Sequence, residues 1–220
     1  MIENVEIKPI PKEIYNEWIL KKHYAKRKCS ISFAYGLFYE EYLVGVCTFG
    51  YPPNYNFNDG KCVFNTYRCL TLELNRLITN DNLPHNILSY FVSRCLKLLP
   101  KPSCIVSYAD PNNGHHGYIY QATNWIYTGN STPKHRYHFE DGTTFDIRRG
   151  IDLKEKEHGK MIYKEKLLPT QRYIYLNGSK QDIKLMKSDL KMKVFEYPKG
   201  ENKKYDASYE CKKIHIGEIS

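Results

Sequence analysis

The chain has 220 residues, of which 41% are hydrophobic and 26% charged, which fits one globular domain with room for an appended segment. Lys and Arg number 33 against 24 acidic residues, a net charge of +9 that favours a phosphate-rich partner such as nucleic acid, although basic charge also serves solubility. No apolar run is long enough to span a bilayer and the seven cysteines show no regular spacing, so we expect a cytoplasmic protein and exclude membrane-spanning and disulfide-rich secreted classes.

The first quarter of the chain predicts a strand, a helix and a hairpin. Residues 5–10 alternate apolar and charged side chains, as is typical of a half-buried strand. Apolar residues on one face predict a helix over residues 12–24. Residues 31–39 and 42–49 are both strand-like, and the Glu40-Glu41 pair is expected to form the turn that joins them.

The middle of the chain predicts two strand–helix units. Residues 64–78 mix strand-like and polar positions and alternate cleanly at their end. Pro84 opens a helix that is expected to run to Leu99, with an apolar stripe along one side. An apolar strand follows at residues 104–109, and a further helix is expected over about residues 117–127.

The last part of the chain predicts a hairpin, one late strand and a basic tail. Residues 136–139 and 143–148 flank a Glu-Asp-Gly turn, and residues 173–176 form the late strand. After them the chain becomes polar and Lys-rich. We therefore predict a folded domain over residues 1–176 and a basic C-terminal extension over residues 177–220.

The extension contains a Lys-rich stretch at residues 197–205 that is expected to be an exposed basic loop. Such a loop could clamp a DNA backbone, because each lysine can replace a condensed counterion on the phosphates. A solvated tail without a partner fits the same residues equally well.

The order of these elements predicts the fold class. It runs strand, helix, hairpin, strand, helix, strand, helix, hairpin. We therefore expect an α/β (more narrowly α+β) protein with a mixed, partly antiparallel sheet and helices on both faces. This order is similar to that of the acetyltransferase-like (GNAT) proteins, the acyl-CoA N-acyltransferase-like fold.

The most informative segment is residues 107–129, where an apolar strand leads into Asp110, a proline and a glycine-flanked histidine pair. Ligands in α/β proteins bind at such strand–loop–helix junctions. A carboxylate at the end of a buried strand can be partly desolvated, which would raise its pKa and suit Asp110 to accept a proton. The same Asp-Pro-Asn-Asn-Gly sequence is also good turn chemistry, in which Asp110 caps the backbone.

The helix expected after this loop carries polar side chains on one face. At helical spacing Tyr120, Gln121 and Asn124 share that face. Amide groups can pair with both donor and acceptor edges of adenine, and an aromatic ring can stack on it. We therefore predict an adenine-reading surface here. Trp125 could stack as well, but we favour a place in the core for it.

Histidines supply a second set of candidates. His23-Tyr24 ends the first predicted helix, where His23 either responds to the helix dipole or enters the site as an acid, base or metal ligand. The adjacent His115 and His116 do not have a standard zinc spacing, and we expect them to make loop or DNA contacts.

The loop at residues 82–86, before the second predicted helix, lies where acetyltransferases bind the pyrophosphate of coenzyme A. Backbone amides at a helix N-terminus suit an anion. However, the glycine-rich Arg/Gln-x-x-Gly-x-Gly/Ala pattern is missing here. This absence argues against an ordinary acyl-CoA enzyme.

Three segments resemble the Mom-like DNA-modification proteins of bacteriophages, a family assigned to the GNAT fold. They are His23-Tyr24 with its basic follow-on, residues 72–77 leading to 83–86 and Ser89, and above all residues 107–129. The resemblance implies conversion of adenine N6 in duplex DNA to a carbamoylmethyl (acetamido) form, which shields phage DNA from host restriction. It also implies the cytoplasm of an infected or lysogenic bacterial host.

The resemblance further implies roles for individual residues. His23, Tyr24, Ser89 and Asp110 match positions regarded as functional, and iron is the implied metal, with His23 and Asp110 as the candidate ligands. Catalytic roles are expected for Asp110, His23, Tyr24 and Ser107. Donor contacts are expected from Asn75, Arg76, Asn86 and Ser89. Contacts to DNA or the base are expected from Tyr120, Gln121, Asn124, His115, His116, Lys26 and Arg27.

The implied reaction joins a two-carbon group to a poor nucleophile, because the lone pair of the adenine amine is delocalised into the ring. Asp110 would remove a proton during attack on the donor, which is acetyl-CoA or a glycyl-type molecule, or a metal would polarise that donor. The adenine is expected to be flipped out of the double-stranded DNA. Two alternatives stay open: a GNAT-type N-acetyltransferase acting on a small amine or a protein, and a non-catalytic DNA-binding anti-restriction protein.

Overall fold

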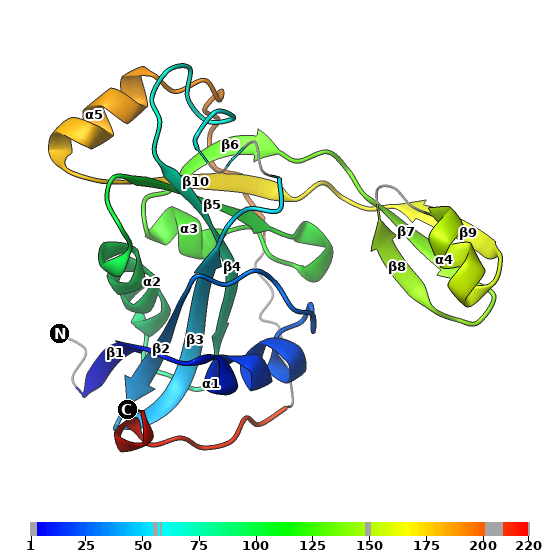
Figure 1. Cartoon of the computed structure of the whole chain (residues 1–220), viewed down its shortest axis with the longest axis horizontal. Helices are drawn as coiled ribbons and strands as arrows, with labels where there is room; N and C mark the ends of the chain where they lie inside the picture. The colour runs from blue at the N-terminus through cyan, green and yellow to red at the C-terminus, as the bar shows by residue number, and fades with distance from the viewer. Residues whose placement is uncertain (1–3, 55–56, 58, 148–150, 201–208, 220) are drawn as a thin grey trace.

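The computed structural model describes residues 4–54, 57, 59–147, 151–200 and 209–219, and it contains a seven-stranded and a three-stranded sheet. Figure 1 shows a main body built around the larger sheet and an arm that carries the smaller one. In spatial order the larger sheet consists of β1 (Val5–Pro9), β2 (Phe33–Tyr39), β3 (Tyr42–Gly50), β4 (Leu70–Thr79), β5 (Ser103–Ala109), β10 (Gln171–Asn177) and β6 (Ile126–Asn130).

The larger sheet is mixed and mostly antiparallel. Its described strands form one parallel pair, β4 with β5, and the other neighbouring pairs are antiparallel. This arrangement confirms the predicted mixed, partly antiparallel sheet. The predicted turn between β2 and β3 is also confirmed, since Glu40 and Glu41 both take positive φ angles of 49° and 69°, as a tight two-residue hairpin requires.

Helices cover both faces of the larger sheet. Because strand residues alternate between faces, Leu37 belongs to the core under α2 (Ile87–Leu98), whereas its neighbour Phe38 belongs to the core that contains Trp18. The helices involved are α2 and α3 (Tyr118–Ala122) on the first face, and α1 (Lys12–Glu17), its π-helical continuation η1 (Trp18–Lys22) and α5 (Lys180–Ser188) on the second. None of the helices in the described ranges is long and apolar enough to cross a membrane.

β4 and β5 are paired over only part of their lengths. Residues 70–73 of β4 are in register with residues 103–106 of β5, yet β4 continues to Thr79 and β5 to Ala109. Each strand keeps its antiparallel partner on the outer side, β3 for β4 and β10 for β5. The sheet therefore opens between the C-terminal ends of its two parallel strands.

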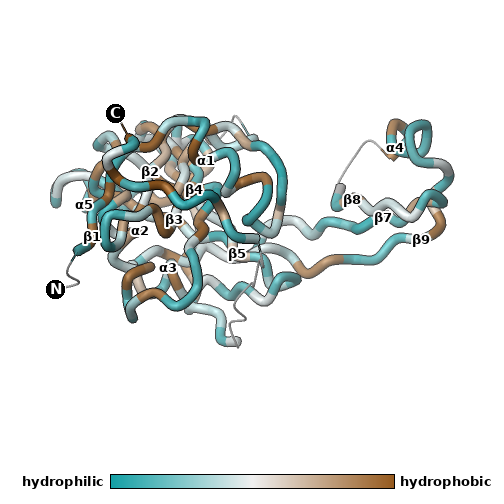
Figure 2. The backbone as a smooth tube through the Cα atoms, turned by 90° about the horizontal axis from the view of Figure 1, so that it is seen from below, coloured by the Kyte–Doolittle hydropathy of each residue, from teal (hydrophilic) through white to brown (hydrophobic). Residues whose placement is uncertain are grey.

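The arm is an excursion of the chain between β6 and β10. Its elements are β7 (His135–Phe139), β8 (Thr144–Ile147), α4 (Ile151–His158) and β9 (Met161–Lys166), with β7 as the central strand. Figures 1 and 2 show that it projects away from the main body in both views. The predicted hairpin corresponds to β7 and β8, with Arg148 outside the described residues, whereas α4 and β9 were not predicted.

The helix predicted over residues 117–127 is wrong in length. α3 ends at Ala122, and the chain from Ile126 onward forms β6. Two neighbours of Ala122 end the helix: the hydroxyl of Thr123 donates back to the carbonyl of Ile119 (2.7 Å), and Asn124 takes a left-handed φ of 61°. The favoured core position of Trp125 is confirmed, since it is 0% exposed.

Of the residues after β10, the described ones in α5 and around Ile214 pack against the main body. Met186 of α5 is buried, and the amide of Leu43 in β3 donates to the carbonyl of Ile214 (2.9 Å). Of the basic loop predicted at residues 197–205, the first part is held beside α3, where the hydroxyl of Tyr118 donates to the carbonyl of Gly200 (2.6 Å). Residues 201–205 lie outside the described residues.

Candidate active site

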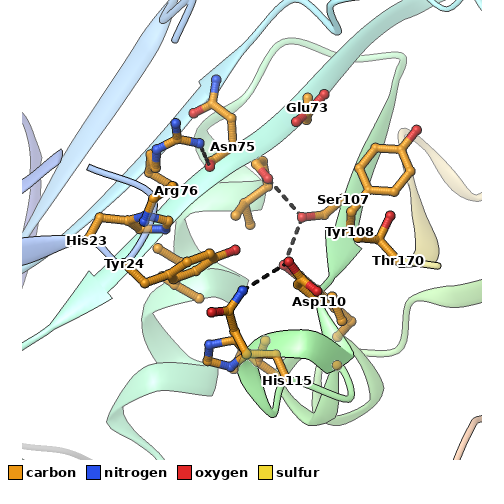
Figure 3. A pocket seen from close by; sticks show the side chains of 18 of the residues that line it. His23, Tyr24, Glu73, Asn75, Arg76, Ser107, Tyr108, Asp110, His115 and Thr170 are labelled. Atoms are coloured by element: carbon orange, nitrogen blue, oxygen red, sulfur yellow. Dashed lines mark hydrogen bonds between the residues drawn. The ribbon is translucent and has the colours of Figure 1, made fainter. Parts of the chain in front are cut away.

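A cleft of about 1550 Å³ opens where β4 and β5 separate. Its lining comes from the ends of both strands, the segment after η1, the start of α2 and the stem of the arm. Figure 3 shows side chains from several of these elements pointing into it. A cleft at the carboxyl ends of parallel strands is the expected position for a ligand.

The end of η1 carries His23 and Tyr24 into the cleft. The amide of His23 donates to the carbonyl of Trp18 (2.9 Å), five residues back, and so closes a π-helical turn. His23 itself has an extended backbone (φ −69°, ψ 138°), so the predicted helix over residues 12–24 ends before it. Such widened turns are frequent at functional sites.

His23 is held neutral and in one tautomer. It is 7% exposed, and its Nδ1 accepts a hydrogen bond from the amide of Ala25 (3.0 Å), which leaves the ring proton on Nε2. Burial, together with the positive charge of Arg76, lowers the pKa of His23 from 6.5 to about 3. At neutral pH His23 can therefore donate one hydrogen bond but carries no positive charge.

Three rings follow one another along the cleft. The ring centroids of His23 and Tyr24 are 4.3 Å apart, and those of Tyr24 and His115 are 5.4 Å apart. Burial and the negative charge of Asp110 raise the pKa of Tyr24, so its hydroxyl keeps its proton. The Nε2 atom of His115 is buried and has no hydrogen-bond partner in the described part of the chain. This side of the cleft thus offers polar ring atoms to a planar ligand.

Asp110 caps the short 3-10 turn η3 (Pro111–Asn113) that follows β5. Its Oδ1 accepts hydrogen bonds from the backbone and side-chain amides of Asn112 (3.0 and 2.8 Å), and its Oδ2 accepts one from the side chain of Asn113 (3.0 Å). The capping interpretation is therefore confirmed. It leaves room for a ligand, because Asp110 lines the cleft and a carboxylate has about four acceptor positions.

Ser107 joins the two separating strands. Its hydroxyl donates to the carbonyl of Leu74 on β4 (2.8 Å) and is hydrogen-bonded to the hydroxyl of Tyr120 on α3 (2.8 Å). Leu74 lies just beyond the last paired residue of β4, so this side chain bridges the strands where the backbone ladder has ended. Ser107 is 1% exposed and Tyr120 8%. This geometry indicates that Ser107 and Tyr120 hold β4 and β5 at a fixed separation and so position the residues of the cleft.

We expect Ser107→Ala to destabilise the protein by about 1–3 kcal/mol, because it leaves the Leu74 carbonyl and the Tyr120 hydroxyl without this buried partner. Urea denaturation measures the difference. Ser89→Ala is the matched control, since that hydroxyl donates to the carbonyl of Asn86 at an exposed position, and its effect is expected to stay within about 0.5 kcal/mol. Equal losses for both variants would contradict the bridging role.

Glu73 is a cleft residue that the sequence analysis did not single out. It lines the cleft at the last paired position of β4 and accepts no hydrogen bond from any described residue. Burial raises the pKa of Glu73 from 4.5 to about 7, although the positive charges of Arg76 and Arg27 act in the opposite direction. A carboxyl group poised near neutral pH suits proton transfer. In the sequence, the feature that could have pointed to Glu73 is a single acidic residue between Leu72 and Leu74.

Arg76 is a buried cation that forms no ion pair with the described residues. It is 8% exposed, its guanidinium donates to the carbonyls of Asn75 (2.5 Å) and Arg27 (3.0 Å), and its Nε is unpartnered in the described structure. Such a group favours an anionic ligand. The side chain of Asn75, by contrast, is occupied: it accepts from the hydroxyl of Thr48 (2.6 Å) and donates to the carbonyl of Ser30 (2.7 Å).

The start of α2 lies along the cleft and contributes Asn86 and Ser89 to its lining. Asn82 and Asn86 take left-handed backbone conformations, with φ angles of 59° and 64°. Asparagine is one of the few residues besides glycine that adopts this conformation readily. The loop therefore bends as a glycine-containing loop can, and the first-turn amides of α2 could hold an anionic part of a donor such as coenzyme A.

Only some of the predicted base-contacting residues reach the cleft. Its described lining includes Tyr120, His115 and Arg27, but not Gln121, Asn124, His116 and Lys26. The predicted common face of Tyr120, Gln121 and Asn124 does not form, because α3 ends at Ala122 and Tyr120 is buried against Ser107. Gln121 instead donates to the carbonyl of His116 (3.3 Å).

The described residues do not fit an iron site with three protein ligands. Among them, no group of three or more His, Cys, Asp or Glu side chains is placed to hold a metal ion. Of the two candidate ligands, His23 has only Nε2 left beside its bonded Nδ1, and both carboxylate oxygens of Asp110 already accept hydrogen bonds from Asn112 and Asn113 and keep only their remaining acceptor positions. No step of the reaction is therefore assigned to iron.

This chain is similar in sequence to known proteins. A sequence model described as the Mom protein family matches residues 4–199. A curated relative, the methylcarbamoylase mom of Escherichia phage Mu, is 34% identical over 116 residues, which are 50% of this chain and 48% of the relative. The match thus spans about half the length of that relative.

A solved structure has a similar fold. The structure of Arabidopsis thaliana NAA60 in complex with a bisubstrate analogue has a TM-score of 0.50 at 11% sequence identity, over 80% of this chain and 99% of that one. A GNAT-family acetyltransferase from Bacillus cereus has a TM-score of 0.40 at 12% identity, over 79% of this chain and 97% of that one. The predicted GNAT-like fold is confirmed.

Proposed function

The chain belongs to the Mom protein family, and on that premise we propose that it is a transferase that modifies the N6 amine of adenine in double-stranded phage DNA. The product is a carbamoylmethyl (acetamido) adenine, which protects the DNA from host restriction. The observation that carries this proposal is the cleft itself. It brings His23, Tyr24 and Asp110, which are distant in sequence, to one opening between β4 and β5.

The cleft side chains have different roles in the reaction of the adenine amine. The amine is a poor nucleophile, so it must be oriented and must lose a proton as its nitrogen bonds to the two-carbon group. Asp110 accepts one N6–H in its remaining acceptor position, and Glu73 takes the departing proton directly or through a water. The donor's leaving group departs with the electron pair of the broken bond. Tyr24 and the neutral His23 each keep a proton that they can donate in a hydrogen bond to the ligand.

The ring series His23, Tyr24 and His115 supports a flipped base as the substrate. An adenine inside the duplex cannot reach the end of a deep cleft, so it must leave the stack. Rings along the cleft can compensate the lost stacking, since base–aromatic stacking contributes about 1–3 kcal/mol per base. This arrangement replaces the adenine surface predicted on α3, two of whose residues lie outside the described lining.

The donor must supply a carbamoylmethyl group, so a glycyl-type compound fits this product, whereas acetyl transfer from acetyl-CoA would give N6-acetyladenine instead. The buried guanidinium of Arg76 and the start of α2 with Asn86 and Ser89 support an anionic donor. These groups lie along the same cleft as Asp110 and Glu73. The donor can therefore bind beside the adenine rather than at a separate site.

Plasmid DNA from cells that express the protein is expected to resist several restriction endonucleases whose sites contain adenine. Endonucleases whose sites contain only G and C should still cut it, because the proposed reaction alters adenine alone. Digestion of the same plasmid from cells with an empty vector is the control. If every endonuclease with adenine in its site cut both plasmids equally well, the proposal would be contradicted.

A further inference from the structure

The arm forms part of the cleft and extends beyond it. Lys134, Arg136 and His138 of its stem line the cleft, together with Asp146 and Glu165 from the neighbouring strands. The rest of the arm projects away from the main body (Figure 1). A ligand larger than a nucleotide that occupies the cleft must therefore pass alongside the arm.

The two faces of the arm sheet differ in charge. On the face that lines the cleft, Arg136 is paired with Asp146 (2.7 Å) and lies 3.7 Å from Glu165. His138 on the same face lies 3.4 Å from Glu165 and stacks on Tyr163, with ring centroids 4.0 Å apart. The charges of this face are therefore largely compensated within the arm.

The opposite face carries lysines that have no acidic partner among the described residues. Register places Lys166 beside His135 and Lys164 beside Tyr137, so these four side chains share one face. Lys164 and Lys166 are exposed, and neither forms an ion pair with a described residue. Towards the tip this face is covered by α4, where His158 lies 4.8 Å from Phe145 between ring centroids. The exposed part is thus a basic and aromatic strip along the stem.

We infer that this strip, made of His135, Tyr137, Lys164 and Lys166, binds the phosphate backbone of double-stranded DNA. The inference rests on the proposed function, which needs a duplex at the mouth of the cleft. Unpaired lysines gain by releasing condensed counterions from DNA, and tyrosine hydroxyls and histidines donate to phosphate oxygens. The strip reads no base sequence, so it holds the duplex while the cleft receives one nucleotide.

The dimensions of the arm agree with this role. β9 has six residues, which at about 3.3 Å per residue makes a strand of about 20 Å. The strip occupies only part of β9: Lys164 and Lys166 lie two residues, about 7 Å, apart along the strand, so both lysines can reach one stretch of phosphate backbone. The arm can therefore contact the backbone of a duplex while its other face continues the cleft.

The test compares two double variants with the same loss of charge. Lys164→Gln with Lys166→Gln removes the strip lysines, and Lys184→Gln with Lys187→Gln removes two exposed lysines of α5, on the far side of the main body from the arm in Figure 1. Fluorescence anisotropy with a labelled duplex gives Kd at several salt concentrations. The arm variant is expected to raise Kd at least about tenfold at 50 mM salt and to reduce the salt slope by about 1.8, whereas the α5 variant should change neither.

Equal binding by the unaltered protein and the arm variant, or an equal loss in the α5 variant, would overturn the inference. Binding is measured without turnover, so the result does not depend on the chemistry. If DNA from expressing cells contains no modified adenine, but the arm variant binds the duplex weakly and the α5 variant does not, the proposed function is wrong and the DNA-binding role of the strip stands. If the arm variant modifies adenine as fast as the unaltered protein and binds the duplex as tightly, the inference about the strip is wrong and the proposed function stands.

Discussion

Replacing Glu73 with glutamine is expected to slow adenine modification by about 100- to 10,000-fold, the usual contribution of a positioned proton acceptor. Burial raises the pKa of this carboxyl group to about 7, so its proton-accepting form becomes populated as the pH rises through neutrality. The unaltered protein should therefore show a rate that increases between about pH 6 and 8. The variant should lose that increase, which rate measurements on a synthetic duplex over this pH range would detect.

The same substitution has a second readout in stability. The pKa of Glu73 is raised from 4.5 to about 7 on folding, so the stability that the protonated group contributes is complete below pH 4.5 and is lost as the pH rises through 7. Glutamine stays neutral, and we expect Glu73→Gln to be more stable than the unaltered protein at pH 8 and about equal to it at pH 4. A variant that is slow and also less stable at pH 8 would indicate structural damage instead of a lost proton acceptor.

Asp110→Asn is expected to abolish detectable modified adenine and to leave the affinity for duplex DNA unchanged. Asparagine has one acceptor oxygen, and its amide would face the donors Asn112 and Asn113, which now bond both carboxylate oxygens. The substrate amine therefore loses its acceptor and its orientation. Misplacement by about 1 Å can lower a rate about 100-fold. Nucleoside analysis of co-expressed DNA and duplex binding by anisotropy measure the two effects.

Asp81→Asn is the matched control for this variant. Asp81 is another carboxylate in the cleft lining, and its neutralisation changes the net charge by the same amount. We expect the control to modify DNA normally. If both variants lost activity alike, a general change of charge in the cleft would explain the result. If Asp110→Asn retained activity, the role assigned to Asp110 would be wrong.

The sequence predicted the strand and helix order well because that order depends on local patterns. Alternation in residues 5–10 and 72–77 and the apolar stripe after Pro84 correspond to β1, β4 and α2. α3 was predicted too long because its apolar and polar residues continue in register past Ala122, and its end is marked only by the Thr123 hydroxyl bond and the left-handed backbone of Asn124. The arm helix α4 was missed because it has no buried residue and no apolar face.

The site was predicted in part for the same reason. His23, Tyr24 and Asp110 could be proposed because each lies in a distinctive local motif, and all three reach the cleft. Glu73 could not, because a charged residue at an alternating strand position normally faces solvent. Its burial depends on where β4 separates from β5, and that separation involves residues about thirty positions apart in the sequence.

Nucleoside mass spectrometry of DNA from cells that express the protein shows directly whether this cleft modifies adenine. We expect a new deoxyadenosine derivative whose added mass equals one carbamoylmethyl group in place of one hydrogen. Deoxycytidine, deoxyguanosine and thymidine should be unchanged. If folded protein is expressed and the four nucleosides are indistinguishable from those of cells with an empty vector, this cleft does not modify adenine.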